Sequence, residues 1–327
     1  MVDAVPVHDQ RLGGSAGAVV LVPDPFLSRR GSSRPDRLSA LDSACAKRRT
    51  EAAVPAVRHP SHTPRWPANM LTAGGGVPMT AAGDSALTRP GLIAMWAAPR
   101  SRSTAVFRYM VEHGGLVALH EPFDNISDYG STKINGDSVS DPVELITTLL
   151  GLAGTATVFF KETTDRRHNA VLADRRFLAD VTHTFLIRAP AEIAASCYAL
   201  QGPRLTLAEI GLEYAYELYK AILAAGGAQP VVVDSDDLIA EPDATIATYC
   251  AATGIPFRRS ALHWSPGERD EWRQSARWHM RVSRSSGFTP SATSYEITTA
   301  NNAMLARYSA HHEPFYRELR VRRMTVS

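Results

Sequence analysis

The chain of 327 residues carries a formal net charge of +2, with 44% hydrophobic and 21% charged residues. These values are ordinary for a soluble globular protein with a sizeable core, and so small a charge gives no support to a nucleic-acid partner. Because the three cysteines form no disulfide framework, and the chain shows neither a secretion signal nor the about 18 apolar residues of a membrane span, we expect a cytoplasmic protein with no membrane partner.

Residues 1–88 differ in composition from the rest of the chain. They are rich in Ala, Arg, Pro, Ser and Gly, as in SRRGSSRPDR and LTAGGGVPMT, and no helical or strand period lasts more than a few residues. Segments of this composition bury too little apolar surface to fold. The sequence thus predicts a disordered low-complexity extension over 1–88 and one folded domain over 89–327, unless translation starts at Met70 or Met79.

From Gly91 onward, strand patterns and helix patterns alternate, which is typical of a mostly parallel sheet with right-handed helical crossovers. The predicted strands are 92–97, 116–123 (which leads into a loop), 155–163, 182–190 and 230–238. The predicted helices are 101–115, 141–154, 168–181, 191–200, 207–227 and 241–254. The tail from Ile255 is rich in Arg, Trp and Ser, and we expect it to be irregular.

A polar loop, Pro99-Arg100-Ser101-Arg102-Ser103-Thr104, joins the first strand to the first helix. Backbone N–H groups at such a turn carry partial positive charge, and the hydroxyl groups and Arg100 add further donors, so the loop suits a phosphate or a sulfate. The G-x-x-x-x-G-K-[ST] pattern of nucleotide kinases and the G-x-G-x-x-G pattern of dinucleotide sites are both absent. A plain serine-capped helix with a surface arginine is the alternative.

Four stretches in this order carry a resemblance to a known family. They are the loop 99–104, the segment LIRAPAEIAASCY, the segment VVVDSDDLIAEP that leads to GIPF, and HEPF after the second strand. The chain resembles the sulfotransferases that use 3′-phosphoadenosine 5′-phosphosulfate (PAPS), of the bacterial small-molecule type, over about residues 91–290. The resemblance implies a P-loop-like three-layer α/β sandwich over 89–327, PAPS as co-substrate and no metal.

The resemblance also assigns the donor-binding residues. It implies that Arg100 stabilises charge on the bridging oxygen, and that the loop binds the 5′-phosphate. Arg102 departs from the family, which usually has glycine there, so we expect its side chain to project into the acceptor site or onto the phosphates. The full set implied for the donor is Arg100, Ser101, Arg102, Ser103 and Thr104 in the loop, Arg188 and Ser196 at the 3′-phosphate, and Arg284, Ser285 and Gly287 as a second basic patch.

The acceptor hydroxyl needs a base, and two neighbouring residues compete for this role. The resemblance favours Glu121 of HEPF, while the ordinary pKa of histidine makes His120 a real alternative. Neighbours on an extended segment point to opposite sides, so we expect one of them to face the acceptor. Lys161 is implied to contact the sulfuryl oxygens, and Glu162 is a lower-ranked base.

Other residues leave open questions. We interpret the acids of 234–237 as structural rather than as a magnesium site. The aromatic residues of the tail either line the acceptor pocket or pack in the core; they are Trp264, Trp272, Trp278 and His279. The sequence predicts a sulfotransferase of secondary metabolism acting on a small-molecule hydroxyl or amine. The alternatives are a small-molecule kinase of the same fold and a non-catalytic nucleotide-binding relative. Acceptor identity, oligomeric state and retention of the sulfate stay open.

Overall fold

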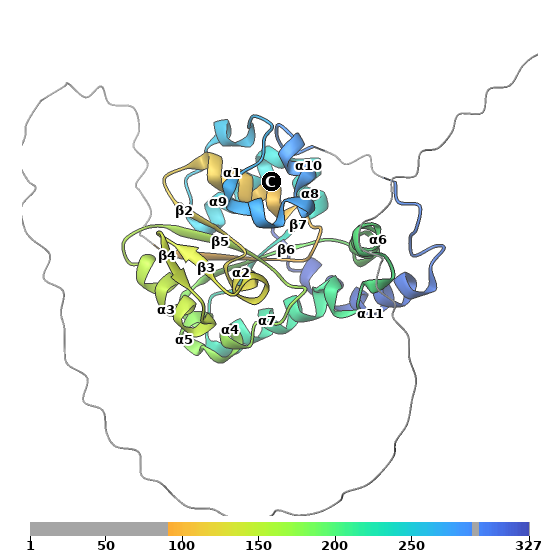
Figure 1. Cartoon of the computed structure of the whole chain (residues 1–327), viewed down its shortest axis with the longest axis horizontal. Helices are drawn as coiled ribbons and strands as arrows, with labels where there is room; N and C mark the ends of the chain where they lie inside the picture. Colours follow the sequence, from red (N-terminus) through yellow and green to blue (C-terminus); the bar gives the residue numbers. More distant parts are fainter. Residues whose placement is uncertain (1–90, 290–293, 327) are drawn as a thin grey trace, which may run out of the picture. The chain divides into compact units, whose positions relative to one another are not determined.

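A five-stranded parallel sheet lies at the centre of the residues that the computed structural model describes, which are 91–289 and 294–326 (Figure 1). The strand order is β2-β5-β1-β6-β7. The strands are β1 (Leu92–Ala97), β2 (Val117–His120), β5 (Val158–Thr163), β6 (Thr182–Ile187) and β7 (Val231–Asp234). The extension expected over 1–88 lies outside the described residues.

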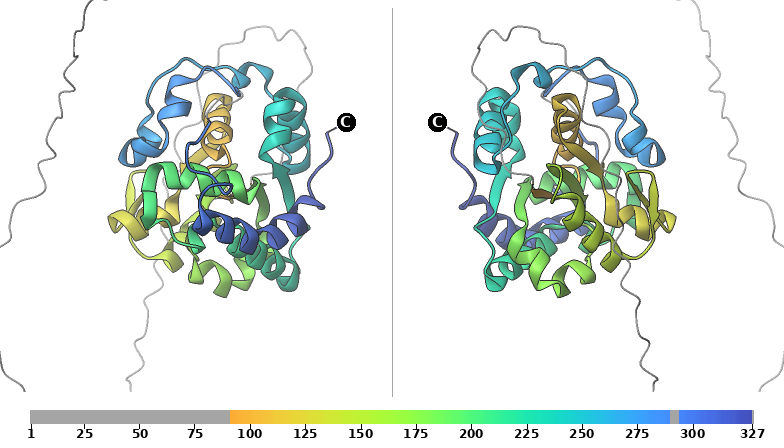
Figure 2. Two further views of the ribbon diagram at one scale, coloured as in Figure 1. Left: turned by 90° about the vertical axis from the view of Figure 1, so that its right-hand side faces the viewer. Right: turned by 90° about the vertical axis from the view of Figure 1, so that its left-hand side faces the viewer.

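The central strand β1 is buried on both faces, which explains its unbroken apolar sequence. Its alternate side chains divide between two clusters. Leu92, Ala94 and Trp96 belong to the cluster formed with α3, α6, α7 and α11, whereas Ile93, Met95 and Ala97 pack with α1 and α9. Helices thus cover both faces of the sheet (Figure 2). The expected three-layer α/β sandwich with a mostly parallel sheet is confirmed.

The helices lie close to their predicted positions, with several additions. They are α1 (Ser103–His113), α2 (Pro122–Tyr129), α3 (Pro142–Leu152), α4 (Asn169–Ala173), α5 (Arg175–Asp180), α6 (Pro190–Gln201), α7 (Leu212–Ala225), α8 (Ser235–Ala240), α9 (Pro242–Thr253), α10 (Met280–Arg284) and α11 (Ala303–Arg320). A short hairpin, β3 (Thr132–Ile134) with β4 (Asp137–Val139), turns at Asn135-Gly136, where both residues have positive φ. Such an Asn-Gly turn matches the twist of a hairpin, and the prediction had missed it.

Three segment predictions were wrong in detail. The strand expected to run through Phe123 ends at His120, and α2 begins at Pro122. The helix expected over 168–181 is divided at Asp174, whose carboxylate accepts a hydrogen bond from the Phe177 backbone N–H and so starts α5. The strand expected over 230–238 ends at Asp234, where α8 follows. A helix-starting proline, Pro122, ended the first of these strands early, and a helix cap, Asp234, ended the last.

The tail from Ile255 contains a long helix, against the expectation of irregular structure. Helix α11 buries Leu305, His312, Tyr316 and Leu319 on one side and packs against α6 and α7. These spacings follow a helical stripe, but two of the four residues are polar and Pro314 lies inside the helix, so an apolar pattern did not reveal it.

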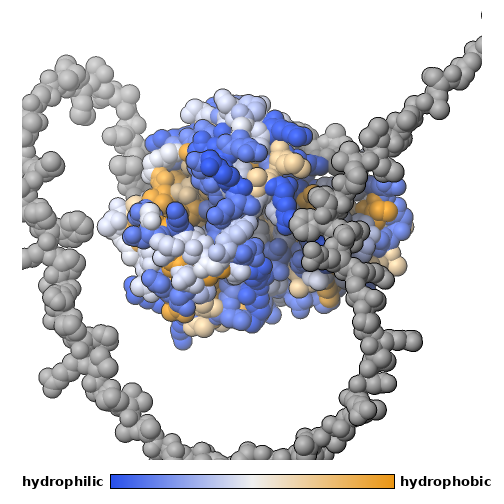
Figure 3. All heavy atoms as spheres, in the orientation of Figure 1, coloured by the Kyte–Doolittle hydropathy of each residue, from blue (hydrophilic) through white to orange (hydrophobic). Residues whose placement is uncertain are grey.

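A membrane span requires a helix that is both long and apolar. None of the helices in 91–289 and 294–326 is long and apolar enough to cross a bilayer. The face seen in Figure 1 is mainly hydrophilic, and its hydrophobic residues form separate small groups (Figure 3). Scattered apolar residues of this kind are normal on a protein surface.

Candidate functional site

A cavity of about 980 Å³ lies at the carboxyl ends of the parallel strands. Open α/β sheets hold their ligands at this edge. The lining comes from the loop after β1, the residue after β2, the end of β5, the residue after β6 and the tail segment 274–289. The sequence-predicted residues that line it are Arg100, Arg102, Ser103, Thr104, Glu121, Lys161, Arg188, Ser196, Arg284, Ser285 and Gly287.

The loop after β1 is held in a tight, partly left-handed conformation. Arg100 and Arg102 have φ values of 60° and 69°, and α1 starts directly after them. Ser103 and Thr104 line the cavity, whereas Ser101 is fully buried and does not. The Ser101 hydroxyl has no hydrogen-bond partner among the described residues. A buried hydroxyl without a partner beside free helix N-terminal N–H groups suits a bound anion.

Arg102 lines the cavity, and its guanidinium is held by contacts at the start of α8. It donates hydrogen bonds to the Ser235 hydroxyl (2.8 Å) and carbonyl (3.1 Å) and lies 3.5 Å from Asp236. The left-handed backbone at Arg102 is the conformation that favours glycine. The loop keeps that conformation with an arginine, because hydrogen bonds and an ion pair to the start of α8 hold the side chain.

Three predicted donor residues lie together on one side of the cavity. Arg100 donates from Nε to the Ser196 hydroxyl (3.1 Å) and from Nη1 to the Trp278 carbonyl (2.9 Å). Arg188 donates to the Arg100 carbonyl (2.8 Å) and pairs with Glu192. Burial lowers the pKa of Arg100, because its charge is removed from water. A bound anion would stabilise the positive charge of the buried Arg100 guanidinium.

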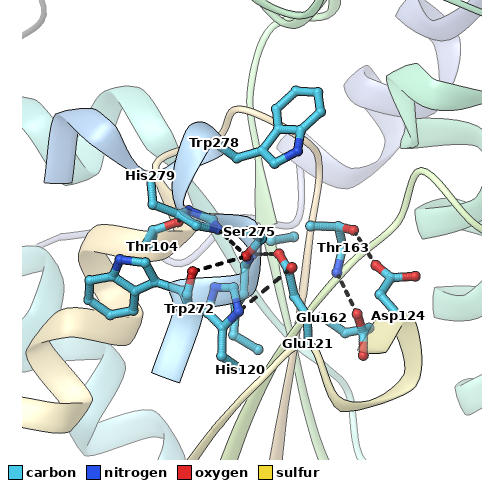
Figure 4. A network of polar contacts seen from close by, with 12 residues as sticks. Thr104, His120, Glu121, Asp124, Glu162, Thr163, Trp272, Ser275, Trp278 and His279 are labelled. Atoms are coloured by element: carbon cyan, nitrogen blue, oxygen red, sulfur yellow. Dashed lines mark hydrogen bonds and ion pairs between the residues drawn. The ribbon is translucent and has the colours of Figure 1, made fainter. Parts of the chain in front are cut away.

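Glu121 and His120 lie side by side, with His120 Nδ1 3.6 Å from the Glu121 carboxylate (Figure 4). Glu121 lines the cavity, and its carboxylate pairs with the buried ammonium of Lys161. His120 does not line the cavity and packs edge-on against the rings of Phe107 and His279. Burial, with the charge of Lys161, lowers the pKa of His120 well below its ordinary value, so the ring is neutral.

The tail segment 274–289 meets the loop after β1 across the cavity. His279 shares a hydrogen bond with the Thr104 hydroxyl (2.9 Å) and another with Ser275 (3.0 Å). Trp278 and His279 line the cavity, while Trp264 and Trp272 belong to the core. The tail aromatics therefore divide between the two alternatives that the sequence left open.

Acidic residues that the sequence analysis did not single out line another part of the cavity. The Thr163 hydroxyl lies 2.8 Å from Asp124 and within hydrogen-bond reach of Asp165. Glu162 is fully buried behind them and accepts a hydrogen bond from the Phe123 N–H (2.8 Å). A usable sequence signal was present, since acids directly follow the ends of two neighbouring strands, β2 and β5.

Burial, followed by the charge of Asp124, raises the pKa of Asp165 to about 6. The folded protein therefore binds more protons than the unfolded chain between pH about 4 and about 6, and its stability falls as pH rises through this window. We expect Asp165→Asn to raise the free energy of unfolding at pH 7 by about 1–3 kcal/mol, with a gain that shrinks towards pH 4. Urea unfolding at several pH values measures this. The exposed Asp180→Asn is the control, and equal stability of wild type and Asp165→Asn at pH 7 would contradict the prediction.

Two groups of side chains among the described residues are arranged as possible metal ligands: His120, Glu121 and His279, and Asp124, Glu162 and His168. In the first group both ring nitrogens of His279 already have hydroxyl partners. In the second, burial raises the pKa of both carboxyl groups, and a shared proton can hold them together. The expectation of no metal stays a prediction.

The acids of 234–237 have structural contacts. Asp234 accepts hydrogen bonds from the Asp236 N–H (3.0 Å) and the Tyr316 hydroxyl (2.9 Å), and Asp237 pairs with Arg323 (3.0 Å). The first contact caps α8, and the others tie this turn to α11 and the residues after it. Their geometry fits the structural reading of the sequence.

A family model described as a sulfotransferase domain matches residues 92–323 of the chain. Two curated Arabidopsis thaliana proteins, branched-chain-amino-acid aminotransferase-like proteins 1 and 2, are 26% and 25% identical over 219 and 209 residues. These matches cover 62% and 61% of this chain but 37% and 36% of the relatives. The chain thus spans little more than a third of the length of these curated relatives.

Two solved sulfotransferase structures are similar to this chain. The sulfotransferase domain of the Synechococcus PCC 7002 olefin synthase is 16% identical, with a TM-score of 0.41, and the match covers 69% of this chain and 95% of that domain. A sulfotransferase from Alicyclobacillus acidocaldarius is 16% identical, with a TM-score of 0.36 and coverage of 61% and 97%.

Proposed function

The chain belongs to the sulfotransferase domain family, and we propose that it transfers a sulfuryl group from PAPS to a hydroxyl, or with less support an amine, of a small molecule. One observation carries this proposal. A single cavity at the carboxyl edge of the sheet joins a cluster of Arg100, Ser196 and Arg188 to a buried Glu121–Lys161 pair. The first group suits a polyanionic donor, and the second supplies a proton acceptor beside a cation.

The residues of the cavity fit the donor that the family implies. The loop after β1 would hold the 5′-phosphosulfate with its N–H groups, the hydroxyls of Ser103 and Thr104, and Arg100. Arg188 and Ser196 would hold the 3′-phosphate. The guanidinium of Arg100 has five N–H donors, and its two contacts in the fold use two of them, so the others can bind the donor.

We assign the removal of the acceptor hydroxyl proton to Glu121, because Glu121 lines the cavity whereas His120 is buried and does not. The acceptor oxygen then forms a bond to sulfur as the bond from sulfur to the bridging phosphate oxygen breaks in line. The hydroxyl proton passes to Glu121, and the electron pair leaves with 3′-phosphoadenosine 5′-phosphate (PAP). Lys161 and Arg100 stabilise the charge on the sulfuryl and bridging oxygens.

A kinase of the same fold has less support from the residues. The loop offers neither the lysine nor the glycines that hold a triphosphate. We also propose a cytoplasmic location, since Cys197 and Cys250 are buried free thiols. The proposal leaves open whether the sulfate is kept or serves as a leaving group in a later step.

Calorimetric titration with PAP tests the donor site, with ATP–Mg²⁺ as the rival ligand. We expect PAP to bind and ATP–Mg²⁺ to bind much more weakly. Arg188→Ala should weaken PAP binding by about 10–100-fold, because a charge-assisted hydrogen bond is lost. Arg259→Ala, at an exposed arginine outside the cavity, is the matched control. Preference for ATP–Mg²⁺, or equal PAP affinity in Arg188→Ala, would contradict the proposal.

A further inference from the structure

Two groups of charged residues in the cavity lining lie on different elements. A basic wall, made of Arg100, Arg188 and Arg284, comes from the loop after β1, the end of β6 and α10. An acidic wall, made of Glu121, Asp124 and Asp165, comes from α2 with the residue before it and the loop after β5. Because PAPS is a polyanion, the basic wall suits the donor, and the acidic wall is left beside the acceptor.

The acidic wall has an incompletely matched carboxylate in Asp124. This residue is 9% exposed, and its Oδ1 has no hydrogen-bond donor among the described residues apart from a proton that it can share with Glu162. The nearest basic groups to Oδ1 are Arg166 Nε and His168 Nε2, each at 3.8 Å. Burial lowers the pKa of His168 to about 4, so this ring brings no charge at neutral pH.

Asp124 and Asp165 also compete for a single hydrogen. Both carboxylates lie within hydrogen-bond reach of the Thr163 hydroxyl, which can donate only once. Figure 4 shows the contact between Thr163 and Asp124. Glu162 lies behind them and adds a third carboxyl group. Three acids so close cannot all ionise unless a cation joins them.

The cations on this side do not match the acids fully. Lys161 pairs with Glu121, and Arg166 pairs more closely with Asp128 (2.7 Å) than with Asp124. The side chain of Arg166 is 44% exposed, and Arg277 of the lining is exposed too, so water screens both charges. Asp124 and Asp165 are therefore acids of the cavity lining whose charge the neighbouring cations do not fully match.

We propose that the acceptor carries a protonated amine beside the hydroxyl that receives the sulfuryl group, and that the ammonium binds between Asp124 and Asp165. This inference rests on the proposed function, because it takes the basic wall as the donor site. An ammonium gives the two carboxylates the hydrogens and the charge that Thr163 cannot supply. An anionic acceptor would meet repulsion from Glu121, Asp124 and Asp165, so the cavity selects against it.

The test uses acceptor probes that differ in charge but little in shape. They are tyramine with 4-ethylphenol and 3-(4-hydroxyphenyl)propionate, and glucosamine with glucose and glucuronate. Each probe is titrated into the PAP-loaded protein by calorimetry and then offered with radiolabelled PAPS. The proteins are wild type, Asp124→Asn, Asp165→Asn and the exposed control Asp180→Asn, each first shown to fold by circular dichroism and to bind PAP.

We expect at least one ammonium probe to bind or react about 10-fold or more better than its neutral partner, and the anions to fail. The preference should largely disappear in Asp124→Asn and Asp165→Asn but persist in Asp180→Asn, with PAP affinity unchanged in all. Binding near pH 6 should release protons, seen as a dependence of the apparent enthalpy on the buffer, because the ammonium favours ionised carboxylates.

The opposite results separate the two proposals. If PAP binds but no ammonium probe binds or reacts, the proposed acceptor class is wrong and the sulfotransferase proposal stands. The same holds if the neutral and anionic probes bind or react as well as the ammonium probes. If Mg²⁺, Mn²⁺ or Zn²⁺ binds with the same dependence on Asp124 while the ammonium probes do not, the acidic wall is a metal site and the inference is again wrong. If PAP itself does not bind, the proposed function fails, and this inference with it.

Discussion

Replacing Glu121 with glutamine is expected to lower kcat/KM for sulfuryl transfer by about 10²–10⁴-fold, the range of a lost general base. The glutamine amide keeps the size of the side chain but cannot accept the hydroxyl proton. Glu121 is the carboxylate that both lines the cavity and pairs with Lys161. The affinity for PAP, measured by calorimetry, should change little, because the change lies on the acceptor side.

The neighbouring His120 provides the contrast for this experiment. Its ring is buried among Phe107, Trp272 and His279, so His120→Phe keeps an aromatic ring there. The change removes both ring nitrogens and the 3.6 Å contact of Nδ1 with Glu121. We expect this variant to stay within a few-fold of wild-type kcat/KM, far from the about 10²-fold minimum for a lost base. Loss of activity in His120→Phe together with full activity in Glu121→Gln would move the base from Glu121 to His120.

The local sequence predicted the parts of the fold that depend on local pattern. The apolar run of β1 ends at Pro99, the loop and α1 follow, and each later strand lies within or close to its predicted range. The placement of Arg100, Arg188 and Ser196 around one point followed from a family resemblance, and their hydrogen bonds show that the fold brings them together. Parallel strands deliver their carboxyl ends to one edge, so this part of the site could be foreseen.

The rest of the site depends on contacts between distant segments. Thr104 and His279 share a hydrogen bond although they lie 175 positions apart, and nothing near either residue indicates the other. Asp124 and Asp165 of the acidic wall were missed for a related reason. Asp124 and Asp165 follow different strands, and only the pairing of β2 with β5 makes them neighbours of Thr163. The direction of the Arg102 side chain was likewise decided by α8, which begins 133 positions later in the chain.

The need for contacts between distant segments also explains why the chemistry of the acceptor could not be predicted from the sequence. The donor side uses one continuous loop and an arginine at a strand end, whereas the acceptor side combines α2, the end of β5 and the tail segment. Residues from several elements can change without disturbing the donor loop. Acceptor selectivity therefore depends on the assembled cavity. The charge of the cavity lining is the first feature from which the class of acceptor can be inferred.

Replacing Arg100 with alanine should lower kcat/KM by about 10²–10³-fold, the cost of losing a donor aimed at developing negative charge. The same change removes the hydrogen bonds to Ser196 and to the Trp278 carbonyl, so PAP binding should weaken as well. Arg100→Lys should recover part of the loss, because the ammonium restores the charge but not the two parallel N–H donors. Steady-state kinetics with PAPS, together with PAP calorimetry, separates the two effects.

The left-handed backbone at Arg100 shapes the interpretation of these variants. Its φ of 60° is strained for alanine and lysine as it is for arginine, so the backbone strain is nearly the same in all three proteins. A difference in activity between Arg100→Lys and Arg100→Ala therefore reports on the charge rather than on the loop. If both variants bind PAP and turn over like Arg259→Ala, Arg100 has no part in donor binding. The loop after β1 would then act through its N–H groups and hydroxyls alone.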